Sequence, residues 1–398
     1  MDITIYPKKL SGSITAIPSK SQAHRLLICA AFSDGITTLR CFSTNQDIEA
    51  TADCLRALGA NVARTKNGYT VEPVQKIPEH AVLNCRESGS TLRFMLPIAG
   101  ALGVKTTFEM SGRLPKRPLS PLWEEMERMG CSLSRPTENT IRLDGKLRSG
   151  EYFIDGGVSS QYITGLLFAI SLLDGASKLH ITGKLESKPY IDMTQKALGL
   201  FGVCADNLAV TGQQLFKTPG DVNVEGDWSN AAFFLAANAL GSQLEILGLD
   251  YDSTQGDRAC ANILQKINKY IIVDAADIPD LVPILAVAAA TSRGAEFQNI
   301  SRLRLKESDR VATVAAMIEK LGGTVHVTEN ELRVFPGKYS SCTIDAAGDH
   351  RIAMAAAIAA TVADGPVTIL GAECVAKSYP SFWDEYKRLG GNYEQYIR

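Results

Sequence analysis

Basic side chains stand close to the beginnings of several apolar segments of this sequence. They are Lys20, Arg25, Arg93, Arg113, Lys116, Arg117, Arg302, Arg304, Lys306, Arg310, Arg351 and Lys377. The first turn of a helix favours Asp, Glu, Ser and Thr, because its unpaired N–H groups make it electropositive. Repeated basic residues at such positions, on a chain of formal net charge −2, therefore indicate a bound phosphate or carboxylate that compensates them.

Small polar residues open other apolar segments in the same way. Ser159, Ser160 and Gln161 come directly before one of them. Any single basic or polar residue of this kind is at least as often solvated surface as a ligand contact. The argument for an anion site therefore depends on the whole collection and on the elements that would bring it together.

One local pattern supplies such elements, because it recurs six times along the chain. A polar cluster leads into about a dozen apolar residues at helical spacing, followed by Gly and a strand-like run. The copies begin at Ser21, Ser88, Ser159, Trp228, Ile278 and Gly348. Helices that are apolar nearly all round, such as AMAAAIAATV near the C-terminus, are expected to be buried.

Amphipathic segments lie between these copies, and most end in Leu-Gly or Met-Gly before a short strand. DIEATADCLRALGANV from Asp47 and ESDRVATVAAMIEKLGGTVHV from Glu307 are examples. Glycine just past the last apolar residue is a helix stop, whereas the copy at residues 258–270 has Asn268 there. The sequence predicts an α/β fold of two similar domains, each of three repeated βαβαββ-type units, with buried helices wrapped by sheets.

Composition limits the remaining function classes. At 398 residues, with 45% hydrophobic and 21% charged residues, the chain is typical of folded globular proteins and long enough for two domains. The net charge of −2 argues against nucleic acid as a partner. The N-terminus lacks an apolar signal core and the apolar runs are too short to span a bilayer, so we expect a cytoplasmic protein without membrane contact.

Cysteine and glycine usage argue against metals and nucleotide cofactors. Nine Cys residues include no C-x-x-C pair, and the five His residues are dispersed, so we expect reduced thiols and no metal site. Neither a P-loop nor a strand-linked G-x-G-x-x-G motif is present. We expect no cofactor.

PSKSQAHR at residues 18–25 resembles the first signature of 5-enolpyruvylshikimate-3-phosphate synthases, which are enolpyruvyl transferases. Further pieces follow in the family's order: SGSTLR (88–93), LPKRP (114–118), SSQ (159–161), SKPYI (187–191), EGD (225–227), IPD (278–280), LKESDR (305–310), GDHR (348–351) and AKSYP (376–380). The resemblance covers essentially the whole chain.

The resemblance implies two similar domains with the active site in the cleft between them. The first strand of this family belongs with the C-terminal half. The expected N-terminal domain is therefore residues 14–225, and the C-terminal domain is residues 1–13 plus 226–398. The resemblance implies small-molecule substrates and no cofactor, and we expect a monomer.

The implied reaction transfers the enolpyruvyl group of phosphoenolpyruvate to the 5-hydroxyl of shikimate 3-phosphate. The methylene carbon is protonated while the hydroxyl attacks the adjacent carbon, and the tetrahedral intermediate then expels phosphate. Such chemistry needs an acid and a base in one site. Carried over by motif, the catalytic residues are Lys20, Asp280 and Glu307.

The same carry-over assigns residues to each substrate. Those for shikimate 3-phosphate are Lys20, Ser21, Arg25, Ser159, Ser160, Gln161, Ser187, Tyr190, Asp280, Arg302 and Lys306. Those for phosphoenolpyruvate are Lys20, Gly89, Arg117, Gln161, Arg310, Arg351 and Lys377. Arginine suits both substrates because its planar fork makes paired, charge-assisted hydrogen bonds to carboxylate and phosphate.

For two of the implied catalytic residues, a purely structural role at a helix N-terminus is also possible. Asp280 precedes an apolar segment, where an Asp often caps a helix, and this role is compatible with catalysis. Glu307 would suit the first turn of a helix, where the dipole favours a carboxylate. For His350, packing or capping beside Arg351 is the preferred interpretation.

Two positions depart from the pattern of many family members. This chain has Glu87-Ser88-Gly89-Ser90 where many have Asn-Ala-Gly-Thr, and Arg302 where many have Asn. Neither departure removes a proposed catalytic group.

Two alternatives stay open. The chain could be a UDP-N-acetylglucosamine enolpyruvyl transferase, although those enzymes typically have Lys-Asn where it has Lys20-Ser21, and a loop cysteine where it has residues 113–117. It could also be an inactive anion-binding scaffold of the same fold, although a scaffold would be free to lose the proposed catalytic residues.

Overall fold

The chain passes from one structural unit to another after Ile17 and returns after Val224. In the computed structural model, which describes residues 1–396, Pro18–Val224 form one unit, here called the middle unit. Met1–Ile17 and Glu225–Arg398 form the other, here called the terminal unit. Each has a separate hydrophobic core built from its own residues.

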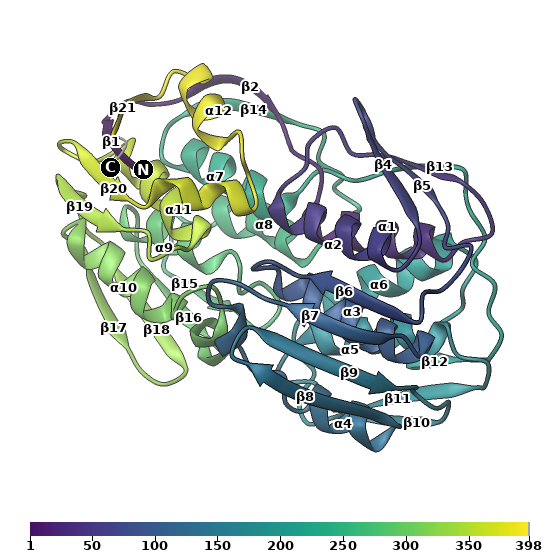
Figure 1. Ribbon diagram of the computed structural model, residues 1–398. Helices are drawn as coiled ribbons and strands as arrows, with labels where there is room; N and C mark the ends of the chain where they lie inside the picture. Colours follow the sequence, from purple (N-terminus) through teal and green to yellow (C-terminus); the bar gives the residue numbers. More distant parts are fainter. Residues whose placement is uncertain (397–398) are drawn as a thin grey trace. The chain divides into compact units, whose positions relative to one another are not determined.

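The middle unit alternates helices with small sheets (Figure 1). Its helices are α1 (Lys20–Ala31), α2 (Gln46–Ala57), α3 (Gly89–Leu102), α4 (Leu122–Arg128), α5 (Ser160–Ser171) and α6 (Lys188–Leu200). Its strands are β3 (Thr37–Arg40), β4 (Asn61–Thr65), β5 (Gly68–Glu72), β6 (His80–Asn84), β7 (Lys105–Glu109), β8 (Cys131–Thr137), β9 (Thr140–Gly145), β10 (Glu151–Asp155), β11 (Ser177–Thr182), β12 (Ala209–Val210) and β13 (Asp221–Asn223). They form sheets in the orders β13-β3-β5-β4, β6-β7-β9-β8 and β10-β11-β12.

The terminal unit repeats this design. Its helices are α7 (Trp228–Ala239), α8 (Ala259–Gln265), α9 (Val282–Ala290), α10 (Arg310–Lys320), α11 (His350–Ala360) and α12 (Phe382–Arg388). Its strands are β1 (Asp2–Tyr6), β2 (Ser11–Thr15), β14 (Gln243–Leu247), β15 (Ile271–Asp274), β16 (Ala295–Gln298), β17 (Thr324–Val327), β18 (Glu331–Phe335), β19 (Cys342–Asp345), β20 (Val367–Leu370) and β21 (Asn392–Tyr396). The sheet orders are β14-β2, β15-β16-β18-β17 and β19-β20-β1-β21.

The predicted repeat is visible in the strand pairing of both units. In the middle unit, β6 is parallel to β7, and β7 and β8 are both antiparallel to β9. In the terminal unit, β15 is parallel to β16, and β16 and β17 are both antiparallel to β18. Two helices fall at the same places in each series, so both follow the order βαβαββ and confirm the predicted unit.

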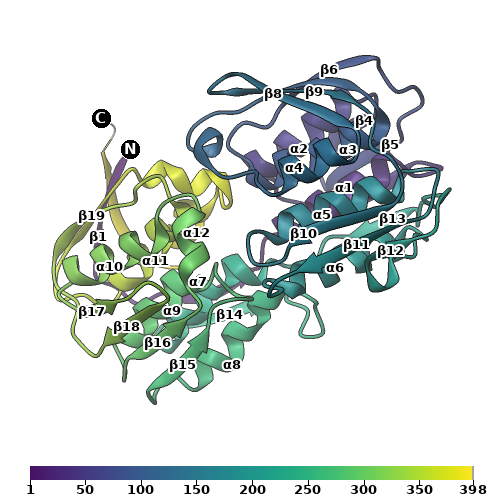
Figure 2. The ribbon, with the colours of Figure 1, turned by 90° about the horizontal axis from the view of Figure 1, so that it is seen from below.

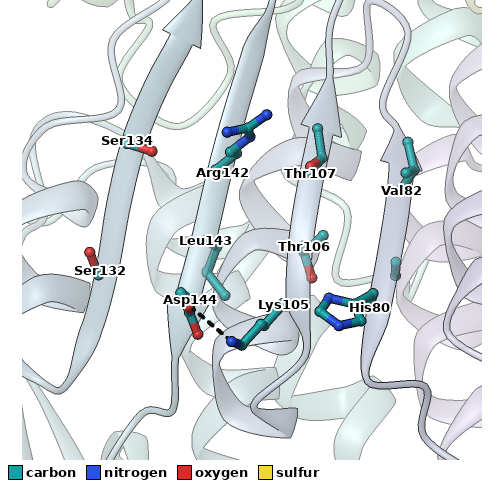
Figure 3. A pocket seen from close by; sticks show the side chains of 11 residues that line it. His80, Val82, Lys105, Thr106, Thr107, Ser132, Ser134, Arg142, Leu143 and Asp144 are labelled. Atoms are coloured by element: carbon teal, nitrogen blue, oxygen red, sulfur yellow. Dashed lines mark ion pairs between the residues drawn. The ribbon is translucent and has the colours of Figure 1, made fainter.

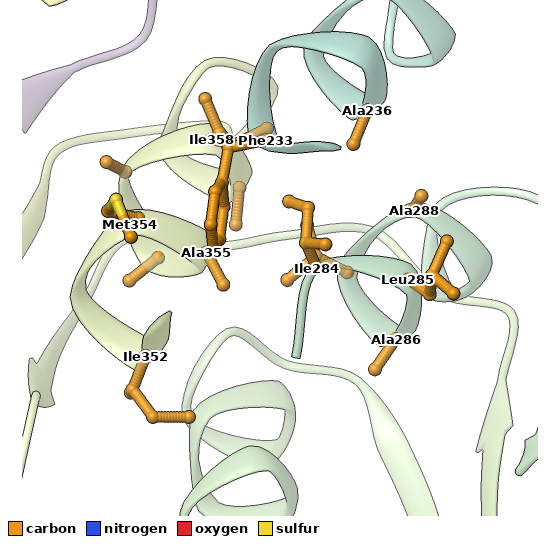
Figure 4. Close-up of a cluster of buried hydrophobic side chains, with 14 of the residues drawn as sticks. Phe233, Ala236, Ile284, Leu285, Ala286, Ala288, Ile352, Met354, Ala355 and Ile358 are labelled. Carbon is orange, nitrogen blue, oxygen red and sulfur yellow. The ribbon is translucent and has the colours of Figure 1, made fainter. Parts of the chain in front are cut away.

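The apolar segments form the buried helices. Every residue of α9 and of α11 is buried, and both pack against α7. Figure 4 shows Ile284 of α9, Ile358 of α11 and Phe233 of α7 together in this core. In the middle unit, β6, β9 and β8 lie against α2, α3 and α4 (Figure 2). A core of helices under sheets follows from helices that have no polar face.

Glycines end the amphipathic helices as predicted. Gly59 follows α2 with φ 102° and Gly322 follows α10 with φ 90°, in the left-handed region that a Cβ disfavours. Another glycine, Gly165 of α5, faces α3. A Cβ there would stand 2.1 Å from the carbonyl oxygen of Arg93, so its absence lets the two buried helices approach closely.

Candidate active site

The polar clusters of the sequence cap the buried helices of the middle unit. Ser19, Ser88 and Ser159 are the N-caps of α1, α3 and α5, and each accepts a hydrogen bond from a backbone N–H of the first turn. Lys20 and Gly89 are the first residues of their helices. The capping chemistry therefore sets the position of the predicted site residues.

Lys20 forms an ion pair with a carboxylate of α2. Its Nζ lies 3.0 Å from Oδ2 of Asp47, and the two side chains are 16% and 7% exposed. Partial burial strengthens such a pair relative to one in water. The pair fixes the ammonium group of Lys20 at the start of α1.

Arg25 is buried among groups of the middle unit. Its guanidinium donates to the Thr194 hydroxyl (2.9 Å), the Thr164 hydroxyl (3.2 Å) and the carbonyl oxygens of Ser21 (2.7 Å) and Tyr190 (2.9 Å). Burial lowers the pKa of Arg25 to about 10, which still leaves it charged at neutral pH. Arg25 thus joins α1 to α5 and α6.

Arginine side chains surround the backbone of Gly89. A Cβ on Gly89 would stand 2.5 Å from Nη1 of Arg117 and 2.6 Å from Nη1 of Arg93. Arg93 also donates to Oε1 of Gln161 (3.0 Å), whose amide nitrogen donates to the Ser90 hydroxyl (3.0 Å). Two guanidinium groups and a helix N-terminus make this place electropositive and suitable for a small anion.

Ser187 introduces α6 in a strained conformation. It is buried and has φ 58° and ψ 38°, a left-handed geometry that is uncommon for residues other than Gly, Asn and Asp. The Tyr190 N–H donates to its carbonyl oxygen (3.1 Å). Strain of this kind at a predicted substrate contact is typical of functional sites.

Arg310 is the centre of a second cluster, in the terminal unit. Its side chain is 1% exposed, and its nitrogens lie 2.7 Å from Oδ1 of Asp280, 2.5 Å from Oε2 of Glu307 and 3.0 Å from Oδ2 of Asp349. Burial opposes its charge, but the three carboxylates raise the pKa of Arg310 above its usual value.

Asp280 is shared by three cations. Besides Arg310, it pairs with Nη2 of Arg351 at 3.0 Å and with Nζ of Lys306 at 3.5 Å. Burial disfavours its charged form, but Arg351, Lys306 and Arg310 outweigh this effect and hold the pKa of Asp280 well below its usual value. Burial lowers the pKa of Lys306 to about 8, although Asp280 acts in the opposite direction.

The simple structural roles considered for Asp280 and Glu307 are wrong. The N-cap of α9 is Leu281, without a side-chain cap, so Asp280 precedes the cap. The N-cap of α10 is Asp309, so Glu307 lies outside the first turn. Both carboxylates point instead to Arg310, and their positions need another explanation than helix capping.

The other predicted residues of the terminal unit lie at short 3-10 helices. Arg302 lies in the turn Ser301–Leu305, and its charge contributes to lowering the pKa of Lys306. Lys377 ends the turn Ala372–Lys377 and is 9% exposed. In the middle unit, Arg117 is the C-cap of the turn Leu114–Lys116.

Comparison with known proteins decides the family. The model of the EPSP synthase family (3-phosphoshikimate 1-carboxyvinyltransferase) matches residues 5–386. The chain belongs to this family.

Two curated EPSP synthases match it over nearly the full length of both chains. A protein of Clostridium kluyveri named 3-phosphoshikimate 1-carboxyvinyltransferase is 39% identical, with 99% of this chain and 98% of that protein covered. A protein of the same name from Clostridium beijerinckii is 38% identical, with 99% of both chains covered.

Solved structures support the fold of the EPSP synthase family. An EPSP synthase from Acinetobacter baumannii superposes with a TM-score of 0.82 at 22% identity, covering 99% of this chain and 100% of that chain. The enolpyruvyl transferase NikO from Streptomyces tendae gives a TM-score of 0.75 at 17% identity, covering 99% and 98%.

Two residues of this EPSP synthase family member entered the site only through the structure. Asp47 pairs with Lys20, and Asp349 pairs with Arg310. Asp349 lies inside the GDHR motif, so that motif carried a signal for it. Asp47 had only its place at the start of an amphipathic segment.

A hollow on the surface of the middle unit is separate from these residues. It has a volume of about 500 Å³ and lies over β6, β7, β8 and β9. Figure 3 shows Lys105 of β7 and Asp144 of the neighbouring strand β9 paired in it, with Nζ and Oδ2 3.4 Å apart. None of the predicted site residues lines this hollow.

In the described part of the chain, no helix is long and apolar enough to span a bilayer.

Proposed function

We propose that this protein is a 3-phosphoshikimate 1-carboxyvinyltransferase, which transfers the enolpyruvyl group of phosphoenolpyruvate to the 5-hydroxyl of shikimate 3-phosphate. Full-length relatives that carry this name, at 38–39% identity, are the observation that carries the proposal. The electropositive surroundings of Gly89, beside Arg93 and Arg117, agree with a substrate that bears phosphate and carboxylate groups.

The reaction is an addition followed by an elimination. The hydroxyl oxygen bonds to C2 of phosphoenolpyruvate and loses its proton, while C3 gains a proton and becomes a methyl group. The C2–O bond to phosphate then breaks and C3 returns a proton, which restores the double bond. Phosphate leaves as the second product, so atoms and protons balance.

Asp280 is proposed to take the proton of the attacking hydroxyl. Three cations keep it ionised, which a general base requires. Glu307 is proposed to move the proton at C3, and Lys20 is proposed as an acid that contacts both substrates. Because Asp280 and Glu307 share Arg310, their titrations are expected to be coupled.

The substrate contacts are proposed as the resemblance implies them. Shikimate 3-phosphate is held by Lys20, Ser21, Arg25, Ser159, Ser160, Gln161, Ser187, Tyr190, Asp280, Arg302 and Lys306. Phosphoenolpyruvate is held by Lys20, Gly89, Arg117, Gln161, Arg310, Arg351 and Lys377. Arg25 and Arg310 are hydrogen bonded or ion paired to other residues of the protein, so we propose that these two arginines also hold the neighbouring site residues in position.

We also propose that the enzyme works as a monomer in the cytoplasm. Its nine cysteines are free thiols, most of them buried, as expected in a reducing compartment. Sedimentation equilibrium would test the first point, and fractionation of the source cells would test the second.

Phosphate release from phosphoenolpyruvate tests the function directly. The assay is run with shikimate 3-phosphate, with UDP-N-acetylglucosamine, and with the Lys20→Ala variant. Release only with shikimate 3-phosphate, lost in the variant, supports the proposal. Release only with the nucleotide sugar would move the enzyme to the other acceptor, and no release with either would favour an inactive scaffold.

A further inference from the structure

A chain of buried polar side chains crosses three helices of the middle unit. Nδ1 of His24 lies 2.7 Å from Oγ1 of Thr51, which lies 2.7 Å from Oγ1 of Thr91, which lies 2.7 Å from Oγ of Ser88. His24 belongs to α1, Thr51 to α2 and Thr91 to α3. All four side chains are buried, so the chain is shielded from bulk water.

The donors and acceptors of this chain can be assigned by counting hydrogens. Thr91 has one hydroxyl hydrogen, and it faces the Ser88 hydroxyl and the carbonyl oxygen of Asp47, 3.3 Å away. The arrangement that leaves no ring N–H of His24 without an acceptor has Thr51 donating to Thr91 and His24 donating to Thr51 from Nδ1. Nε2 of His24 is left without a hydrogen, and it is buried with no hydrogen-bond partner among the described residues.

The charge state of His24 agrees with this assignment. Burial lowers its pKa to about 3, with the nearby cations Lys20 and Arg25 adding to the effect against Asp47. The ring is therefore neutral at physiological pH and carries one hydrogen. A neutral imidazole with its hydrogen on Nδ1 gives both threonine hydroxyls a donor and an acceptor, and Nε2 is then a bare nitrogen.

The chain ends on groups that the proposed function uses. Asp47, whose carbonyl accepts from Thr91, pairs through its carboxylate with Lys20. Ser88 is the N-cap of α3, whose first residue is Gly89 beside Arg93 and Arg117. The hydroxyls thus connect the lysine of α1 with the electropositive start of α3.

We propose that Thr51 and Thr91 are positioning residues, whose hydroxyl chain from His24 to Ser88 holds Lys20 and Asp47 in register with the start of α3. The proposal rests on the proposed function, because it assigns the start of α3 to phosphoenolpyruvate. Valine would fill the same volume without an internal hydrogen-bond requirement. A buried polar network with paired hydroxyls rigidifies its surroundings, and an anion site at the start of α3 benefits from that rigidity.

Substitutions that keep or remove the hydroxyl test the proposal. Thr91→Val and Thr51→Val remove it, Thr91→Ser and Thr51→Ser retain it, and Thr106→Val is a matched control. Thr106 is a buried residue of β7 whose hydroxyl donates to the Val104 carbonyl (2.9 Å), outside the chain. For each variant, kcat and both KM values are measured together with the melting temperature.

The expected result is a split between the two substrates. The Val variants should raise KM for phosphoenolpyruvate at least fivefold and KM for shikimate 3-phosphate by a smaller factor, because Lys20 serves both substrates whereas Gly89 and Arg117 are assigned to phosphoenolpyruvate alone. The Ser variants and Thr106→Val should stay within twofold for both. Val variants with unchanged KM values, whether or not their melting temperatures fall, would show that the hydroxyls only support packing and would overturn the proposal.

The tautomer of His24 gives a readout that does not depend on activity. Long-range ¹H–¹⁵N spectra should show a neutral ring with its hydrogen on Nδ1 at pH 5 to 8, and Thr51→Val should shift that signal. A hydrogen on Nε2 would contradict the assigned direction. If the wild-type protein shows the expected tautomer but no phosphate release, the proposed function fails while the hydrogen-bond chain stands.

Discussion

Asp280 and Arg310 form an ion pair of 2.7 Å in which the arginine side chain is almost fully buried. The same carboxylate is bonded by Arg351 from the first turn of α11. A base with this many cationic neighbours stays ionised over the whole working pH range, and its substitution leaves two buried guanidinium groups with less compensation.

Asp280→Asn is therefore expected to lower kcat by about 10²- to 10⁴-fold, the usual contribution of a general base. Circular dichroism and the melting temperature establish that the variant is folded. Asp309→Asn is the matched control, because Asn also caps a helix and α10 should be preserved. A kcat within threefold of wild type in folded Asp280→Asn would remove Asp280 from the mechanism.

Glu307→Gln is expected to lower kcat by about 10²-fold or more, because Gln can neither accept nor return the proton at C3. The amide can still contact Arg310, so both KM values should change little. Exchange of deuterium from solvent into the methylene group of phosphoenolpyruvate measures the proton step directly. Glu319→Gln, on the exposed end of α10, serves as control. Normal exchange in Glu307→Gln would assign the proton to another group.

Lys20→Ala is expected to lower kcat/KM for both substrates by at least about a hundredfold, because it removes both a cation and a proposed acid. Lys178→Ala removes an exposed lysine of β11 and should leave the activity unchanged. Isothermal titration with shikimate 3-phosphate separates binding from chemistry. Full binding and full turnover in Lys20→Ala would contradict the proposed role.

Lys306 predicts an alkaline change in substrate affinity. With a pKa of about 8, its charge is lost at lower pH than that of an ordinary lysine, so KM for shikimate 3-phosphate should rise by up to about tenfold per pH unit above pH 8. Lys306→Arg should remove the rise, because arginine stays charged. A wild-type KM that is flat from pH 7 to 9.5 would show that the charge of Lys306 is not used.

Asp257 predicts a pH dependence of stability. Burial, with Asp280 nearby, raises its pKa to about 7, so the native protein keeps a proton that the unfolded chain releases near pH 4. The free energy of unfolding should therefore fall between about pH 4 and pH 7, by a few kcal/mol from this group. In urea titrations, the free energy of unfolding of Asp257→Asn should equal that of the wild type at pH 4 and exceed it at pH 8. If the free energy of unfolding changed with pH in the same way in both proteins, the raised pKa of Asp257 would be contradicted.

The positions of the helices could be predicted from the sequence, whereas the contacts between residues far apart in the chain could not. Apolar periodicity, the polar residues before each apolar segment and the glycines after it are local signals, and they predict α1, α3, α5, α7, α9 and α11 correctly. Asp47 lies 27 positions from Lys20, and Asp349 lies 39 from Arg310, and no local signal specifies such pairs. The same reason applies to the hydroxyl chain of Thr51 and Thr91, because neither threonine differs in sequence from an ordinary helix residue and only the packing of three helices brings them together.

The family resemblance implies domain crossings near residues 13 and 226, and the chain changes structural unit after Ile17 and after Val224. A hydrogen bond from the Asp227 N–H to the Ile17 carbonyl (2.7 Å) joins the segment that leaves the terminal unit to the segment that re-enters it. Because of this hydrogen bond, the terminal unit includes a few residues beyond the expected boundary near residue 13.

The place of β1 has a consequence for how the protein is made. β1 pairs with β20 on one side and β21 on the other, so a strand made before the middle unit pairs with two strands made after it. The middle unit has its own core and can fold during synthesis, while residues 1–17 remain tethered beside it without their partners. Completion of the terminal unit is thereby postponed until β21 has been made, and Ile3 and Ile5 of β1 lack their partners in the nascent chain until then.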